Sequence, residues 1–173
     1  MITRINSVKS YLLLLVFGLT IVGFSNKTND DSAKDAATLS IEKKDKLHFN
    51  ASLKGSNEVP ANDSNATGEA IVSINKEETM IHFKLITANI ENVTASHFHM
   101  APAGSNGGVV VGLYSNPNQP SGPANGILAE GYITADDIGE SGLSDLIDAM
   151  RAGNIYVNVH TTSHLGGEIR GQL

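Results

Sequence analysis

Apolar and polar residues alternate along several short stretches of this chain, which is the pattern of half-buried β-strands. The clearest stretch covers residues 154–160, where Ile155, Val157 and Val159 alternate with polar side chains. A second short strand at 168–173 follows a turn that contains a Gly-Gly pair, so the sequence ends in a predicted β-hairpin. Similar patterns predict strands at 47–53, 70–75, 80–86, 93–100 and 126–133, and a continuous apolar run predicts a buried strand at 109–113.

In one segment before the terminal hairpin, apolar residues recur at helical spacing instead of alternating with polar ones. Thr134 followed by Asp137 is typical of a helix start with a capping box. Four apolar residues then predict a short helix over 143–152, closed by Gly153: Leu143, Leu146, Ile147 and Met150. With its many glycines in turns, the chain is predicted to be all-β, a Greek-key-like antiparallel β-sandwich of about seven or eight strands with this one short helix.

The first 46 residues differ from the rest. Arg4 and Lys9 precede an apolar run at 11–24, and Gly23 and Ser25 suit a cleavage after residue 25. This layout predicts a signal peptide at 1–25; an uncleaved anchor is the alternative, but the run is shorter than the ~20 residues of a spanning helix. Residues 26–46 are too polar to form a core and are predicted to be a flexible linker to a domain at 47–173. We therefore expect a secreted or extracytoplasmic protein, in the periplasm or at the cell surface, with no membrane insertion after cleavage.

Composition and charge narrow the function classes. The chain contains no cysteine, which excludes disulfides, thiolate metal sites and a cysteine nucleophile. Residues 47–173 hold five basic and 13 acidic side chains, a net charge of −8 that argues against nucleic acid as a partner. The sequence also lacks a Gly-x-Ser-x-Gly motif and a phosphate-binding loop, so no hydrolase or nucleotide site is predicted.

Four separated motifs resemble those of the CHRD family, a domain found in the animal extracellular protein chordin and as a single exported domain in bacteria. They lie at residues 49–60 (Phe-Asn-Ala-Ser-Leu-Lys-Gly-Ser-Asn-Glu-Val-Pro), 66–70, 95–107 and 156–173. The resemblance implies an extracytoplasmic β-sandwich module without established enzymatic activity. We therefore expect a non-enzymatic binding or structural role at the cell exterior, with an extracellular protein or a surface polymer as the partner.

Histidines at two places predict an alternative function. Residues i and i+2 of a strand share a face, so His97 and His99 can project side by side, roughly 6.5–7 Å apart along the chain. With His160 and His164 from the terminal hairpin, they could bind Cu or Zn, which accept imidazole ligands without thiolate. The alternative is that these histidines hydrogen-bond loop backbones and serve folding alone.

The same histidines carry a second, fainter resemblance. His97-Phe-His99 resembles the copper-binding strand of copper/zinc superoxide dismutases, and the segment ending at His160 resembles their late copper-ligand strand. The chain departs from those enzymes because it has no disulfide pair and no His-rich zinc loop. Superoxide dismutase-like redox chemistry is therefore the alternative to a non-enzymatic protein.

Two further predictions concern charged and polar side chains. Arg170 would need a carboxylate partner if buried, and Glu58 and Glu168 are the candidates for a structural ion pair, with substrate recognition as the alternative. His48 and His82 fall on polar strand faces without partner spacing and are predicted to face solvent.

Overall fold

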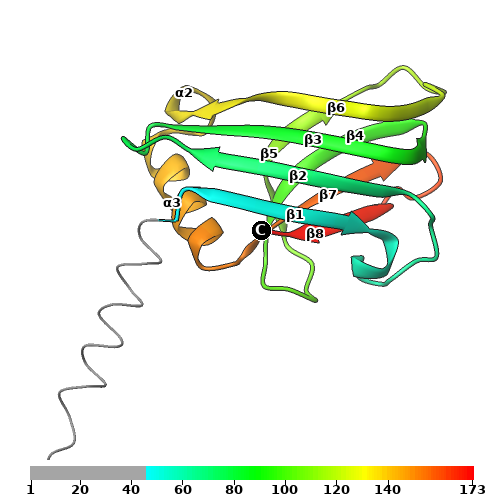
Figure 1. Cartoon of the computed structure of the whole chain (residues 1–173), viewed down its shortest axis with the longest axis horizontal. Coiled ribbons are helices and arrows are strands. Elements are labelled where there is room, and N and C mark those ends of the chain that lie inside the picture. Colours follow the sequence, from blue (N-terminus) through cyan, green and yellow to red (C-terminus); the bar gives the residue numbers. More distant parts are fainter. Residues whose placement is uncertain (1–45) are drawn as a thin grey trace, which may run out of the picture.

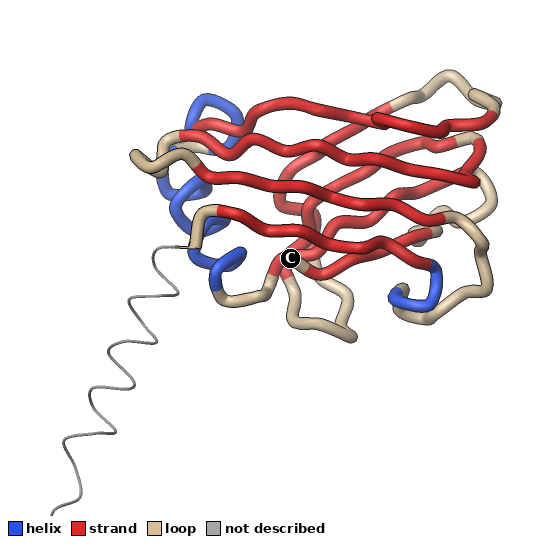
Figure 2. Tube along the Cα trace, in the orientation of Figure 1, coloured by secondary structure: helices blue, strands red, loops and turns tan. Residues whose placement is uncertain are grey.

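The computed structural model describes residues 46–173, which form eight strands, two short α-helices and one 3-10 helix, η1 (Gly55–Asn57) (Figures 1 and 2). The predicted signal peptide and all of the predicted linker except Lys46 lie outside the described residues. The strands are β1 (His48–Lys54), β2 (Thr67–Ile74), β3 (Met80–Glu91), β4 (Val93–Met100), β5 (Gly108–Ser115), β6 (Pro123–Thr134), β7 (Ile155–Thr161) and β8 (Ile169–Gln172).

All strand pairs are antiparallel, in the order β5-β4-β7-β8-β1-β2-β3-β6. The sheet folds over so that β6-β3-β2-β1 form one layer and β5-β4-β7-β8 lie behind it (Figure 1). The layers join along one side through β1 and β8, where Lys54 pairs with Arg170. On the other side the two edge strands, β5 and β6, lie close to each other without pairing. The sheet is therefore nearly, but not fully, closed. The all-β, antiparallel prediction is confirmed, with eight strands.

The core lies between the two layers and follows the predicted alternation. Phe49, Val72 and Phe83 point inward from the front layer, while Phe98 and Val157 come from the back layer. The rings of Phe83 and Phe98 meet edge-on with centroids 6.3 Å apart, which is a favourable aromatic geometry. Apolar residues at every second position of both layers therefore hold the layers together.

Two helices, α2 (Ala135–Ile138) and α3 (Glu140–Arg151), occupy one end of the layers. The predicted helix start is confirmed: the Thr134 backbone N–H donates to Asp137 Oδ2 at 2.8 Å. The helix predicted at 143–152 begins earlier, at Glu140. The sequence pattern missed the first turn because its residues lie towards solvent and include no apolar side chain. No helix in residues 46–173 is long and apolar enough to cross a membrane.

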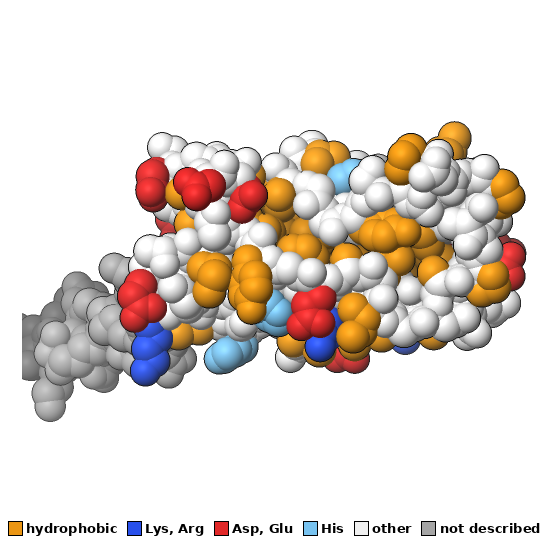
Figure 3. All heavy atoms as spheres, turned by 90° about the horizontal axis from the view of Figure 1, so that it is seen from above, with side chains coloured by type: hydrophobic (Ala, Val, Ile, Leu, Met, Phe, Trp, Pro, Cys, Tyr) orange, Lys and Arg blue, Asp and Glu red, His pale blue; other side chains and the backbone are white. Residues whose placement is uncertain are grey.

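The prediction of a buried strand at 109–113 is wrong. Strand β5 pairs with β4 alone among the described strands, and 57% of Val109 is exposed. Its apolar residues instead lie near the open side between the layers, together with those of β6. Hydrophobic side chains are visible on this side of the molecule in the view from above (Figure 3). On β6, Ile127 is 59% exposed, while Leu128 is partly buried against the core.

The core packing leads to a test of the fold. Phe98 is fully buried, so Phe98→Ala should lower the free energy of unfolding by about 3–5 kcal/mol through lost burial and a residual cavity. Ile127 on β6 is 59% exposed and provides the control. Ile127→Ala should change the free energy of unfolding by about 0.5 kcal/mol or less. Urea unfolding measures both, and equal effects of the two substitutions would contradict this packing.

Candidate metal centre

The predicted site residues gather on the outer face of the back layer. In β7 the side chains of Ile155, Val157 and Val159 join the core, so the residues between them point the other way. The register places His97 of β4 opposite Asn158 of β7. Neighbouring strands therefore present their polar residues on one common surface.

Loops cover much of this outer face. The Asn57 side chain donates to the Arg170 carbonyl at 3.0 Å, and Asn106 donates to the Val59 carbonyl at 2.7 Å. These bonds fasten the β1–β2 and β4–β5 loops over β8 and to each other. As a result Asn158 is only 2% exposed although it is polar and lies outside the core. Polar groups here are shielded from water, which strengthens their interactions.

Three histidines converge on this face. One ring nitrogen from each of His97, His99 and His160 lies within 4.8 Å of the other two. His97 Nδ1 and His160 Nε2 are 3.1 Å apart, and the ring centroids of His97 and His99 are 5.5 Å apart. The structure thus places the His-x-His pair on one face and brings His160 next to it.

Backbone carbonyls determine which nitrogens of two rings are free. His99 Nδ1 lies 3.0 Å from the Gly107 carbonyl oxygen, and His160 Nδ1 lies 3.0 Å from that of Leu165. A carbonyl oxygen only accepts, so both Nδ1 atoms carry the proton and both Nε2 atoms present a lone pair. His99 Nε2 is buried and has no hydrogen-bond partner in the described part of the chain. Donation from the distal ring nitrogen to a carbonyl is the usual arrangement of a metal-ligating histidine.

The environment also keeps the rings of His97 and His160 neutral. Burial lowers the pKa of His97, and the neighbouring His160 and His99 lower it further. Burial likewise lowers the pKa of His160; its hydrogen bond to Leu165 opposes this effect, and His99 adds to it. Neutral imidazoles keep the lone pairs that a metal ion requires.

The spacing suits a small divalent ion. Ligand distances of ~2.0–2.1 Å in a tetrahedral site correspond to nitrogens roughly 3.4 Å apart. The three nitrogens already lie within 4.8 Å of one another, so small ring rotations would suffice. In the metal-free protein His97 Nδ1 donates to His160 Nε2, so a metal ion would replace this hydrogen bond and leave the His97 proton on Nε2. With that change of tautomer, we assign His97 Nδ1, His99 Nε2 and His160 Nε2 as the atoms that can converge on one ion.

His164 does not join this group. Its Nδ1 lies 3.4 Å from Glu168 Oε2. The Glu168 carboxylate in turn accepts hydrogen bonds from Ser64 Oγ at 2.7 Å and Thr161 Oγ1 at 2.6 Å. The structure therefore brings together three of the four predicted ligands. The fourth lies beside Glu168, and its Nδ1 has no hydrogen-bond partner among the described residues.

A stack of side chains supports the centre, and the sequence did not indicate it. The Arg170 guanidinium lies 3.4 Å from the ring centroid of Tyr156, and the Tyr156 and His99 rings are parallel with centroids 4.8 Å apart. The Tyr156 hydroxyl also accepts the Gly107 N–H at 3.2 Å. Tyr156 thus holds both the His99 ring and the loop residue that sets its tautomer.

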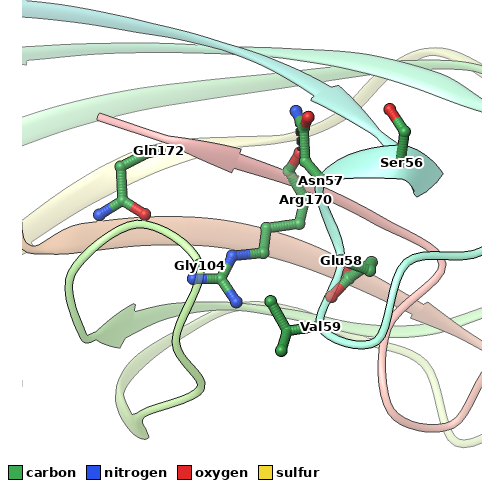
Figure 4. Close-up of a pocket in the computed structure, with 7 residues that line it drawn as sticks. All are labelled: Ser56, Asn57, Glu58, Val59, Gly104, Arg170 and Gln172. Atoms are coloured by element: carbon green, nitrogen blue, oxygen red, sulfur yellow. Dashed lines mark hydrogen bonds between the residues drawn. The ribbon is translucent and has the colours of Figure 1, made fainter.

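Arg170 is buried as anticipated but has different partners from those predicted. Its guanidinium donates to Ser105 O at 2.7 Å and Asn106 Oδ1 at 3.1 Å. Neither Glu58 nor Glu168 forms an ion pair with it within the described region. Glu58 and Arg170 instead line a cleft of about 410 Å³ (Figure 4), together with Ser56, Asn57, Val59, Gly104 and Gln172.

Glu58 is a buried carboxyl group with few interactions that offset its loss of hydration. It is 7% exposed, and its Oε1 has no hydrogen-bond partner among the described residues. Burial raises the pKa of Glu58 to about 7, against the opposing effects of the Arg170 charge, the Val59 N–H and His164. A side chain at Gly167, where φ is +128°, would collide with Glu58 Oε1, so this loop needs glycine.

The two remaining histidines differ from each other. His48 is exposed on β1, as predicted. His82 is only half-exposed: its Nε2 lies 3.2 Å from Glu130 Oε1, and its ring lies 5.0 Å from that of Tyr132. His82 was predicted to face solvent, and it is only partly exposed because the β3–β6 pairing places Tyr132 opposite it.

The raised pKa of Glu58 predicts a pH-dependent stability. Between pH 4.5 and about 7 the folded protein keeps a proton that the unfolded chain releases, so the free energy of unfolding falls as pH rises. Glu58→Gln should therefore stabilise the protein at pH 8 by on the order of 2 kcal/mol, and the difference should vanish at pH 4. Urea unfolding at both pH values measures this, with the exposed Glu69→Gln as control. A Glu58→Gln protein less stable than the wild type at pH 8 would refute it.

Comparison with known proteins identifies the family. The sequence model of the CHRD domain matches residues 49–173, from the first buried residue of β1 to the end of the chain. Neither a search of curated proteins nor a search of solved structures found a match. The matched region includes all three converging histidines and covers most of the chain, which therefore belongs to the CHRD family.

Proposed function

We propose that this protein is an exported, non-enzymatic CHRD module whose ligand is a Cu(II) or Zn(II) ion held by His97, His99 and His160. The observation that carries the proposal is the convergence of three ring nitrogens within 4.8 Å on one outer face. Export rests on the signal-peptide pattern of residues 1–25. The family resemblance supports a role outside the cytoplasm.

The unpaired nitrogen of His99 favours ligand binding over a purely structural role, whereas His160 uses both ring nitrogens: Nδ1 donates to the Leu165 carbonyl and Nε2 accepts from His97 Nδ1. Histidines that only fasten loops would use both ring nitrogens for hydrogen bonds, because a buried unpaired nitrogen costs about 1–3 kcal/mol. His99 fastens its loop through Nδ1 alone, and its Nε2 stays buried and unpaired. A metal ion would use this lone pair.

The donor atoms define the kind of metal. Three neutral imidazoles without thiolate or carboxylate suit Cu(II) and Zn(II), whereas Mg²⁺ and Ca²⁺ prefer oxygen ligands. The order of affinities for divalent metals puts Cu(II) above Zn(II) at such a site. We therefore expect tighter binding of copper.

Binding of an extracellular protein or a surface polymer is the second candidate function. The cleft of about 410 Å³ beside Arg170 supports it, because polar and charged side chains such as Ser56, Asn57 and Arg170 line it. Such binding would persist in chelator, whereas a metal-dependent function would be lost together with the ion.

Metal stoichiometry tests the proposal. The protein, loaded with Cu(II) or Zn(II) and then dialysed, should retain about one equivalent by elemental analysis. His99→Ala and His160→Ala should reduce this below about 0.2 equivalents, because two donors bind weakly. His48→Ala and His164→Ala serve as matched controls and should leave it unchanged. Equal retention by His99→Ala and the wild type would refute the site.

The stack on His99 predicts a second effect. Tyr156→Phe keeps the ring but removes the hydroxyl that accepts the Gly107 N–H, so the carbonyl that orients His99 is less firmly held. Zinc affinity, measured by competition with a chromophoric chelator, should fall by roughly 10-fold, as for other outer-shell partners. The unfolding midpoint of the metal-free protein serves as the stability control. Unchanged zinc affinity would show that Tyr156 has no part in orienting the ligand.

A further inference from the structure

The number of protein donors leaves the centre coordinatively incomplete. Zn(II) takes four ligands, and sites with three protein ligands keep the fourth position for water or substrate. In the described part of the chain, the converging group contains three residues, His97, His99 and His160. The fourth predicted ligand, His164, lies beside Glu168 and is not part of the group.

The two sides of the centre differ in exposure. His99 is 8% exposed and packs on Tyr156, so it forms the protein side of the centre. His97 and His160 are only half-buried. Solvent can therefore reach the centre from the side of His97 and His160.

The charge balance indicates which ligand would bind there. Three neutral imidazoles leave the charge of a divalent ion uncompensated, in contrast to a site that contains a carboxylate or thiolate ligand. The carboxylate of Glu168 is held by Ser64 Oγ and Thr161 Oγ1 and lies beside His164. The open position thus favours a small anion over a neutral or cationic ligand.

We propose that the metal centre keeps one coordination position open on the side of the partly exposed His97 and His160, filled by water and exchangeable for a small monovalent anion. This inference rests on the proposed metal binding and adds the class of external ligand. The exchange needs no redox step, because water leaves as the anion enters and the metal keeps its oxidation state.

Azide titration of the Cu(II)-loaded full chain tests this inference. A saturable azide-to-copper charge-transfer absorption should appear at one azide per copper, and the copper-induced relaxation of water protons should fall in parallel. Copper that binds stoichiometrically without either change would overturn the open position but leave the metal site standing. Protein that retains no copper would instead overturn the proposed function, so the two failures are distinguishable.

Discussion

The pairing of β4 with β7 is the constraint on which both the core and the candidate centre depend. In this register His97 lies opposite Asn158, and Phe98 lies opposite Val157. Since side chains alternate between faces, a slip of one residue would send the apolar side chains out of the core and the histidines into it. The free energy gained by burying Phe98 and Val157 therefore also fixes the positions of the histidine rings.

A second consequence is that β7 is buried on both faces. Its inner residues meet the front layer, while its outer residues lie under loops that hydrogen-bond to β8 and to each other. Burying polar groups is unfavourable unless they find partners, and most here do. The exceptions include Glu58 Oε1, Asn158 Oδ1 and His99 Nε2. Several unpaired buried atoms in one region are typical of a binding site. Within this region, the three histidines are the residues with suitable metal donors.

Much of the fold could be predicted from the sequence because alternation is a local signal. Strand β4 occupies the residues expected for it, and the His-x-His pair shares a face because of strand geometry alone. The exposure of β5 could not be predicted, since a continuous apolar run does not reveal whether a strand lies in the centre or at the edge. Likewise His164 is separated from the other histidines by its contact with Glu168, and Arg170 bonds to a distant loop. Those contacts join residues far apart in sequence or depend on side-chain orientation, for which no sequence pattern exists.

The most direct test of the central claim is diffraction from crystals of the copper-loaded protein, recorded at the copper absorption edge. The account predicts a single anomalous peak at ~2.0–2.2 Å from His97 Nδ1, His99 Nε2 and His160 Nε2, with no other protein atom at bonding distance. A strong peak bound elsewhere, with these three nitrogens still bonded only to protein groups, would contradict it. In that case the histidines would serve to fasten the loops of the outer face.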